Sequence, residues 1–102
     1  MEQLNQTNFK EAVRGNFTLV DFYATWCGPC KMLHPVLEEV EKEVQNVSFK
    51  KLDVDEGNEI AKEYGVMSIP TIVLFKDGIE VARNVGFLGK QELISWIETN
   101  RK

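Results

Sequence analysis

The junction between an apolar run and a pair of cysteines constrains the fold of this chain more than any other feature. Residues 16–24, NFTLVDFYA, are nearly all β-branched, aromatic or aliphatic, which predicts a strand covered on both faces. WCGPC follows at residues 26–30, and from residue 29 to residue 44 apolar side chains recur at helical spacing. This stripe consists of Leu33, Val36, Leu37, Val40 and Val44. The sequence therefore predicts a buried strand that leads through the two cysteines into a long amphipathic helix.

The rest of the chain predicts an α/β fold. Further segments have the spacing of a helix or a strand, namely helices at 7–13 and 58–65, a strand at 47–54, strands at 71–76 and 79–86, and a helix at 90–102. Asp77-Gly78 between two of these strands is a strong hairpin signal. Because strands alternate with helices before this hairpin, we expect one domain over residues 1–102 with a mixed sheet. The crossover from Gly28 to Asn46 is long enough for a right-handed parallel connection, whereas the direction of the 71–76 strand stays open.

The composition and charge of the chain exclude several classes of function. Its 102 residues are 43% hydrophobic and 27% charged, so a core can form without structural metals or staples. The 12 basic and 16 acidic residues give a formal net charge of −4, which argues against nucleic acid as the main partner. No apolar run approaches the ~20 residues of a membrane span, and the start, MEQLNQTNFK, lacks the pattern of a secretory signal. We therefore expect a cytoplasmic protein that binds neither nucleic acid nor a membrane.

Cys27 and Cys30 are the only cysteines, and three interpretations of the pair are open. A structural staple gains little stability, because a bridge between neighbours closes almost no loop. A metal site has Cys27, Cys30 and His34 as candidate ligands, but structural zinc sites use four, and the chain has no other Cys or His. In the third interpretation the thiols form a reversible redox couple, which is typical of paired cysteines in a reducing compartment.

The position of the pair favours the redox interpretation. Pro29 suits the first turn of a helix, where its missing N–H costs nothing. Cys27 would lie at the helix N-terminus, where unpaired N–H groups and the helix dipole stabilise a thiolate. Cys30 would fall within the first turn, and we expect it to be less exposed. The pattern therefore predicts that Cys27 attacks a disulfide and that Cys30 resolves the mixed disulfide.

The motif and its surroundings resemble the thioredoxin family over essentially the whole chain. The matching pieces, in chain order, are VDFYATWCGPCK at 20–31, Pro35, KLDVD at 51–55, SIPT at 68–71, FKDG at 75–78 and Val85-Gly86. The resemblance implies an α/β fold in which a central mixed five-stranded sheet is flanked by four helices. It also implies a short first strand at Met1–Leu4 and an antiparallel strand that begins at Thr71.

The same resemblance implies a protein-disulfide reductase whose dithiol form reduces disulfides in client proteins. Its partners would be those clients and thioredoxin reductase, an NADPH-dependent flavoprotein that restores the dithiol. We expect a monomer that needs no metal or bound cofactor. Gly28-Pro29 resembles the dipeptide of the reducing type, since oxidising relatives carry a histidine there. Two alternatives stay open, a dithiol oxidase or isomerase on the same fold and a non-catalytic scaffold that uses an apolar surface.

Residues around the cysteines have roles that the pattern and the resemblance suggest together. Asp21 is a carboxylate inside an apolar strand, so we expect it to be buried and its pKa to be raised. The resemblance implies that this carboxylate accepts the proton of Cys30. Lys51 matches the family lysine beside the carboxylate, and we expect Lys51, Gly28 and Pro29 to tune the redox chemistry.

SIPT resembles the cis-proline loop of the family, although an X–Pro bond in a folded protein is cis only ~5–6% of the time. The resemblance implies a cis Ile69–Pro70 bond and an Ile69 backbone that pairs with an extended client segment. It further implies an apolar rim that binds clients. That rim would consist of Trp26, Pro29, Ile69, Pro70, Gly86 and Phe87.

Overall fold

The computed structural model describes all residues from 1 to 102 and contains five strands and four helices. In chain order they are β1 (Glu2–Leu4), α1 (Phe9–Ala12), β2 (Phe17–Tyr23), α2 (Gly28–Glu43), β3 (Val47–Asp53), α3 (Asn58–Glu63), β4 (Thr71–Lys76), β5 (Ile79–Val85) and α4 (Lys90–Asn100). Each segment for which the sequence predicted a helix or a strand contains that element, and this confirms the predicted α/β fold. None of the helices is long and apolar enough to cross a membrane.

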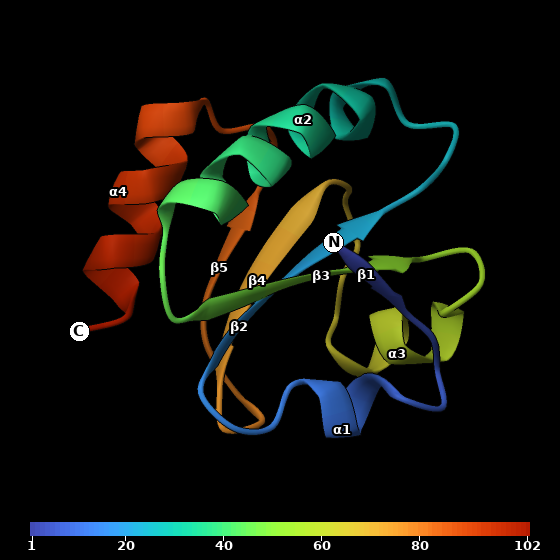
Figure 1. The fold of residues 1–102 in the computed structure, drawn as a ribbon. Coiled ribbons are helices and arrows are strands. Elements are labelled where there is room, and N and C mark those ends of the chain that lie inside the picture. Colours follow the sequence, from blue (N-terminus) through green and yellow to red (C-terminus); the bar gives the residue numbers. More distant parts are fainter.

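The sheet has the strand order β1-β3-β2-β4-β5 (Figure 1). β1 and β2 both pair with β3 in parallel, which confirms the parallel crossover through α2. β4 pairs antiparallel with β2 and with β5, as the resemblance implied for the strand at Thr71. β2 is therefore the central strand, and its end at Tyr23 delivers the chain to the start of α2.

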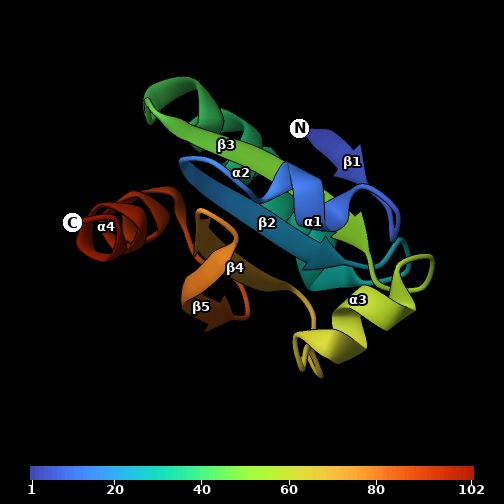
Figure 2. The same cartoon turned by 90° about the horizontal axis from the view of Figure 1, so that it is seen from below.

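Alternate residues of β2 face opposite sides of the sheet. Val20 and Phe22 belong to a core cluster with residues of α1 and α3, whereas Leu19 belongs to a cluster with residues of α2 and α4. Figures 1 and 2 show the same two layers, with α2 and α4 on one face of the sheet and α1 and α3 on the other. Asp21 is two residues beyond Leu19 and so faces the α2 side. The strand thereby points this carboxyl group toward the helix that carries Cys30.

An aromatic group centred on Phe9 fixes the layer of α1 and α3. Its ring centroid lies 5.9 Å from that of Phe22, 5.7 Å from that of Phe75 and 5.3 Å from that of Tyr64. Such pairs contribute about 0.5–1.5 kcal/mol each beyond their buried area. Tyr64 caps the C-terminus of α3, and Gly65, with a φ of +65°, ends the helix as predicted. The chain that leaves α3 toward β4 therefore starts from a well-packed position.

Asp77 and Gly78 connect β4 to β5 with φ angles of +53° and +83°. Positive φ at both central residues defines a type I′ turn, which the Asp-Gly pair predicted. The hairpin returns the chain so that Val85 of β5 pairs with Thr71 of β4. The end of β5 consequently lies beside the Ile69–Pro70 segment that precedes β4.

Candidate active site

Cys27 and Cys30 lie at the start of α2 and are joined by a disulfide, with their Cα atoms 5.3 Å apart. Cys27 is the N-cap residue, and the backbone N–H of Cys30 donates a hydrogen bond to its Sγ at 3.2 Å. Pro29 occupies the first turn of the helix, as predicted. The N–H groups and the dipole at this helix end favour a negative charge on the sulfur that they face. Cys27 Sγ is thus the sulfur that accepts a hydrogen bond at this helix end.

The two cysteines differ less in exposure than the sequence predicted. Cys27 is 5% exposed and Cys30 is 3% exposed, so both are buried. The pair packs with buried Ala24 and with partly buried Tyr23, Val54 and Ile69. The chemical difference between the sulfurs thus comes from the hydrogen bond that Cys27 receives and not from a difference in burial.

Asp21 is buried in the central strand, as expected, with only 1% of the residue exposed. Its Oδ1 is the one buried side-chain oxygen or nitrogen in the structure without a hydrogen-bond partner. Burial raises the pKa of Asp21 from its ordinary value of 3.8 to about 7, and the charge of Lys51 opposes part of this shift. Lys51 is the β3 residue that pairs with Asp21 across the sheet. The carboxyl group is therefore one that exchanges its proton near neutral pH.

A cavity of about 320 Å³ brings the Asp21 carboxyl group and Cys30 together. Its lining residues are Asp21, Tyr23, Ala24, Thr25, Cys30, Lys31, His34 and Lys51. The volume exceeds what several water molecules require, so a water-mediated path between Asp21 and Cys30 fits within it. The Lys51 Nζ lies 5.6 Å from the centroid of the Tyr23 ring, and both residues line the cavity. This cation–π contact holds the Lys51 ammonium group at the cavity wall.

His34 lies beside the cysteines but forms no metal cluster with them. Its Nε2 is 3.4 Å from the Glu38 carboxylate one turn further along α2. The structure groups no three His, Cys, Asp or Glu side chains in an arrangement that could hold a metal ion. The sulfurs of Cys27 and Cys30 bond to each other instead.

The residues predicted to form the client-binding rim differ in exposure. Trp26 is 69% exposed and its Nε1 donates to Asp55 Oδ2 at 2.8 Å, while Phe87 is 44% exposed. Ile69 is partly buried against the cysteines, and Pro70 is buried. The Ile69–Pro70 bond is cis, as the resemblance implied, and the Pro70 carbonyl accepts the Gly86 N–H at 2.8 Å. Pro70 therefore supports the rim from beneath and offers no exposed side chain.

Sequence reasoning did not single out two exposed methionines or the contacts of one arginine. Met67 is 95% exposed and Met32 is 63% exposed. Met67 immediately precedes the SIPT segment, and Met32 is not part of the apolar stripe of α2. The exposure of both side chains could therefore have been predicted from their positions in the sequence. Arg83 bonds to the backbone at the end of α3, and no spacing rule for strands points to that contact.

Comparisons with known proteins agree on one family. The family model described as Thioredoxin matches residues 1–99. A thioredoxin of Chlamydia trachomatis serovar D is 45% identical over 99% of both chains, and one of Chlamydia caviae is 51% identical over 88% of both. A solved mutant thioredoxin from Halobacterium salinarum superposes with a TM-score of 0.90 at 38% identity, covering 99% of this chain and 90% of that one. The oxidised mitochondrial thioredoxin 3 of Saccharomyces cerevisiae gives 0.88 at 40%, covering 97% and 94%.

Proposed function

Because the chain belongs to the thioredoxin family and is a thiol–disulfide oxidoreductase, we propose that it reduces protein disulfides with Cys27 as the nucleophile and Cys30 as the resolving cysteine. The observation that carries this proposal is the Cys27–Cys30 disulfide at the start of α2, with Cys30 and Asp21 lining the same cavity. The buried Asp21 carboxyl group has no hydrogen-bond partner for its Oδ1, so it does not stabilise the fold, and a role in the reaction explains its presence.

In the proposed reaction two electrons pass from the dithiol to the client disulfide. The Cys27 thiolate attacks one sulfur of the client disulfide, forms a mixed disulfide and releases the other client sulfur as a thiolate. Cys30 then loses its proton and attacks Cys27 Sγ. The Cys27–Cys30 disulfide forms, and the second client sulfur leaves as a thiolate. The client gains two thiols once these thiolates are protonated.

Asp21 is the proposed acceptor of the Cys30 proton. Its pKa of about 7 leaves a fraction of the carboxyl groups ionised at neutral pH, which suits a general base. The shared cavity lets a water molecule carry the proton from the thiol to the carboxylate. Lys51 holds the Asp21 pKa below the value that burial alone would produce, and we assign it, with Gly28 and Pro29, a tuning role.

The proposed client surface surrounds the cysteines. Trp26, Pro29 and Phe87 offer exposed apolar area, and Gly86 has a φ of +100°, which lets the chain turn beside Pro70. No backbone hydrogen bond of the protein involves Ile69, so its N–H and carbonyl are available to an extended client segment. Recognition through backbone groups and apolar area suits an enzyme that accepts many disulfide-containing proteins.

Thioredoxins act on disulfide-containing client proteins, and a reductase returns them to the dithiol form. We propose that the reductase of this chain is an NADPH-dependent flavoprotein, thioredoxin reductase. We further propose that residues 1–102 act as a single monomeric domain in the cytoplasm. The net charge of −4 supports the monomeric state, because a charge far from zero opposes self-association.

The test is the reduction of insulin by the whole chain, driven by NADPH and the cognate reductase. The wild-type protein should turn over many insulin disulfides per molecule, and Cys27→Ser should turn over none. The equilibrium of the Cys27–Cys30 couple with glutathione should lie well toward the disulfide form of the chain, because a reducing member is a stronger reductant than glutathione. Absence of turnover, or a couple more oxidising than glutathione, contradicts the proposal and favours an oxidase or isomerase.

A further inference from the structure

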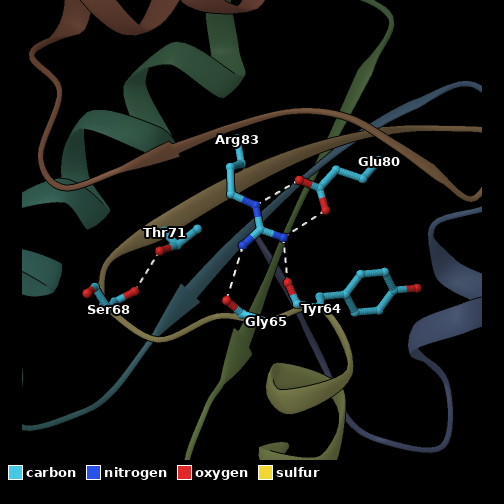
Figure 3. A network of polar contacts seen from close by, with 6 residues as sticks. All are labelled: Tyr64, Gly65, Ser68, Thr71, Glu80 and Arg83. Carbon is cyan, nitrogen blue, oxygen red and sulfur yellow. Dashed lines mark hydrogen bonds and ion pairs between the residues drawn. The ribbon is translucent and has the colours of Figure 1, made fainter.

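Arg83 of β5 binds the backbone where α3 ends (Figure 3). Its Nη2 donates to the Tyr64 carbonyl at 2.5 Å, and its Nη1 donates to the Gly65 carbonyl at 3.4 Å. These carbonyls belong to the C-terminal end of a helix, where the dipole favours a positive charge. One side chain therefore ties the edge strand of the sheet to the end of α3.

Glu80 holds the guanidinium group of Arg83 in place. Its two carboxylate oxygens accept from Nε at 2.7 Å and from Nη2 at 2.8 Å, a bidentate arrangement that fixes the plane of the group. The side chains of Arg83 and Glu80 are 29% and 30% exposed, so solvent screens the pair only in part. The hydrogen bond that Arg83 donates to Glu80 also raises the pKa of Arg83, which keeps the guanidinium group charged.

Arg83 and Glu80, together called the clamp below, form one of several contacts that hold the segment from Gly65 to Pro70. At its start the Val66 N–H donates to the Ala61 carbonyl at 2.9 Å. The Thr71 hydroxyl donates to the Ser68 carbonyl at 2.6 Å, and the Gly86 N–H donates to the Pro70 carbonyl at 2.8 Å. The contacts of Arg83 and Gly86 come from β5 and the residue that follows it. Between the fixed points no backbone hydrogen bond involves Met67 or Ile69. The strand thus fixes the ends of a segment whose middle is available to a partner.

We propose that Arg83, braced by Glu80, is a positioning residue that sets the height of the Gly65–Pro70 segment above the cysteines and thereby selects extended protein disulfides as substrates. This inference rests on the proposed function, because the segment matters only if Ile69 pairs with a client. Backbone pairing requires a hydrogen bond of ordinary length, so a small displacement of the segment weakens it. A small disulfide needs only access to Cys27 and is insensitive to that displacement.

The chain offers a matched control at its other end. Arg101 Nη1 donates to the Gln45 carbonyl at 2.5 Å, and Arg101 Nη2 pairs with Glu98 at 2.8 Å. This arrangement repeats the one at Arg83, with an acidic residue three positions earlier and a backbone carbonyl of another segment. Gln45 lies beyond the C-terminal end of α2, at the opposite end of that helix from the cysteines. Arg101→Ala therefore removes the same kind of contact at a place outside the proposed client surface.

The experiment compares two substrates for the whole chain in its reduced form. Rates are measured with insulin and with a small aromatic disulfide for wild type, Arg83→Ala and Arg101→Ala. Arg83→Ala should lower kcat/KM for insulin about tenfold through a higher KM, since hydrogen bonds from a charged group are lost, and should leave the small disulfide within about twofold. Arg101→Ala should change neither. An equal fall for both substrates, or no fall for insulin, overturns the inference.

A second variant and a second measurement test the inference even if Arg83→Ala does not fold. Glu80→Ala keeps the arginine but releases its brace, and it should reduce the insulin rate by a smaller factor with the small disulfide unaffected. Amide hydrogen exchange should quicken at Gly65 and Val66, whose N–H groups donate to the Lys62 and Ala61 carbonyls, in both variants and stay unchanged in Arg101→Ala. Unchanged exchange in this segment overturns the clamp. Failure of the wild type itself to reduce either substrate would instead contradict the proposed function.

Discussion

Asp21 and Asp53 lie on neighbouring strands, and both are buried, with exposures of 1% and 6%. Asp53 ends β3, where its Oδ1 accepts the Asp55 N–H at 2.8 Å and its carbonyl accepts the Gly57 N–H at 2.7 Å. Asp21 lies in the middle of β2, and its Oδ1 has no partner. The same residue type is thus used in two ways. The Asp53 carboxylate shapes the turn that leads to α3, and the Asp21 carboxyl group lies buried with no hydrogen-bond partner for its Oδ1.

The surroundings of the two residues explain the difference. A carboxylate at a strand end accepts N–H groups of the following turn, which satisfies it locally. A carboxylate in a central strand has all neighbouring backbone groups engaged in the sheet, so only side chains and water can satisfy it. Here the neighbouring cavity holds Cys30 and Lys51. Under the proposed function, the unpartnered carboxyl group has a reactive role at a cost in stability, whereas the partnered one stabilises the turn.

The largest expected effect is the loss of disulfide reduction when a cysteine beside Asp21 is replaced, compared with a replacement of Asp53. Cys27→Ser should abolish disulfide reduction, and Cys30→Ser should accumulate mixed disulfides with clients, because the first attack occurs and the second does not. Asp53→Asn should retain wild-type turnover. Non-reducing electrophoresis after incubation with a client disulfide detects the trapped species. Equal trapping by both cysteine variants would contradict the assigned roles.

The two aspartates should respond to replacement with opposite signs. Asp21→Ala should raise the free energy of unfolding of the oxidised protein by about 3 kcal/mol at pH 8, because a buried, unpartnered charge is removed. Asp53→Ala should lower it by about 1–2 kcal/mol, because the N–H groups of the turn lose an acceptor. Urea unfolding of both variants measures the change. A loss of stability in Asp21→Ala would show that its carboxylate has a partner after all.

Loss of the proton acceptor should also slow the second chemical step. In Asp21→Ala the mixed disulfide should decay more slowly than in wild type, by about 10²-fold, the lower end of what general bases contribute. Rapid-mixing experiments with a single client disulfide resolve this step. Asp21→Asn serves as the control of matched shape. Unchanged decay in both variants would remove Asp21 from the reaction.

The stability difference at Asp21 should depend on pH in one direction. Its folded pKa of about 7 exceeds the ordinary value of 3.8, so between these values the folded state binds more protons than the unfolded state. Wild-type stability relative to Asp21→Ala therefore falls as pH rises through this window and levels off above pH 7. At pH 4 the two proteins should differ by less than about 1 kcal/mol. A difference that does not change with pH would contradict the assignment of the shift to Asp21.

Lys51→Met should have the smallest effect of this series. The Lys51 charge lowers the pKa of Asp21 while burial raises it, so removal of the charge should move the Asp21 pKa further upward. The optimum pH of client reduction should move upward with it. A pH–rate profile of the variant measures the shift. An unchanged profile would place Lys51 outside the electrostatics of the site.

Much of the fold followed from local patterns. The apolar run at 16–24 and the stripe from Leu33 to Val44 predicted the central strand and the long helix, because each periodicity fits one kind of element. The type I′ turn followed from Asp77-Gly78 for the same reason. The direction of β4 did not follow from periodicity, since a strand pattern is the same for parallel and antiparallel pairing, and only the family resemblance supplied it.

Part of the site could be predicted because one residue differs in polarity from its neighbours in the sequence. Asp21 stood out because a carboxylate interrupts an apolar strand, and the structure confirms its burial. The burial of Pro70 did not follow from its motif. The Arg83 contacts with Tyr64 and Gly65 were also missed, because they join residues far apart in the chain and depend on side-chain reach across the fold.

The most direct test of the account is the titration of the Asp21 carboxyl carbon by NMR in the oxidised protein, with Asp21→Asn to assign the resonance. The account predicts a single midpoint near pH 7, since a buried carboxyl group without a partner holds its proton until neutral pH. A midpoint below pH 5 would mean that Asp21 is stabilised as a carboxylate throughout. It could then neither destabilise the fold nor serve near neutral pH as the acceptor of the Cys30 proton.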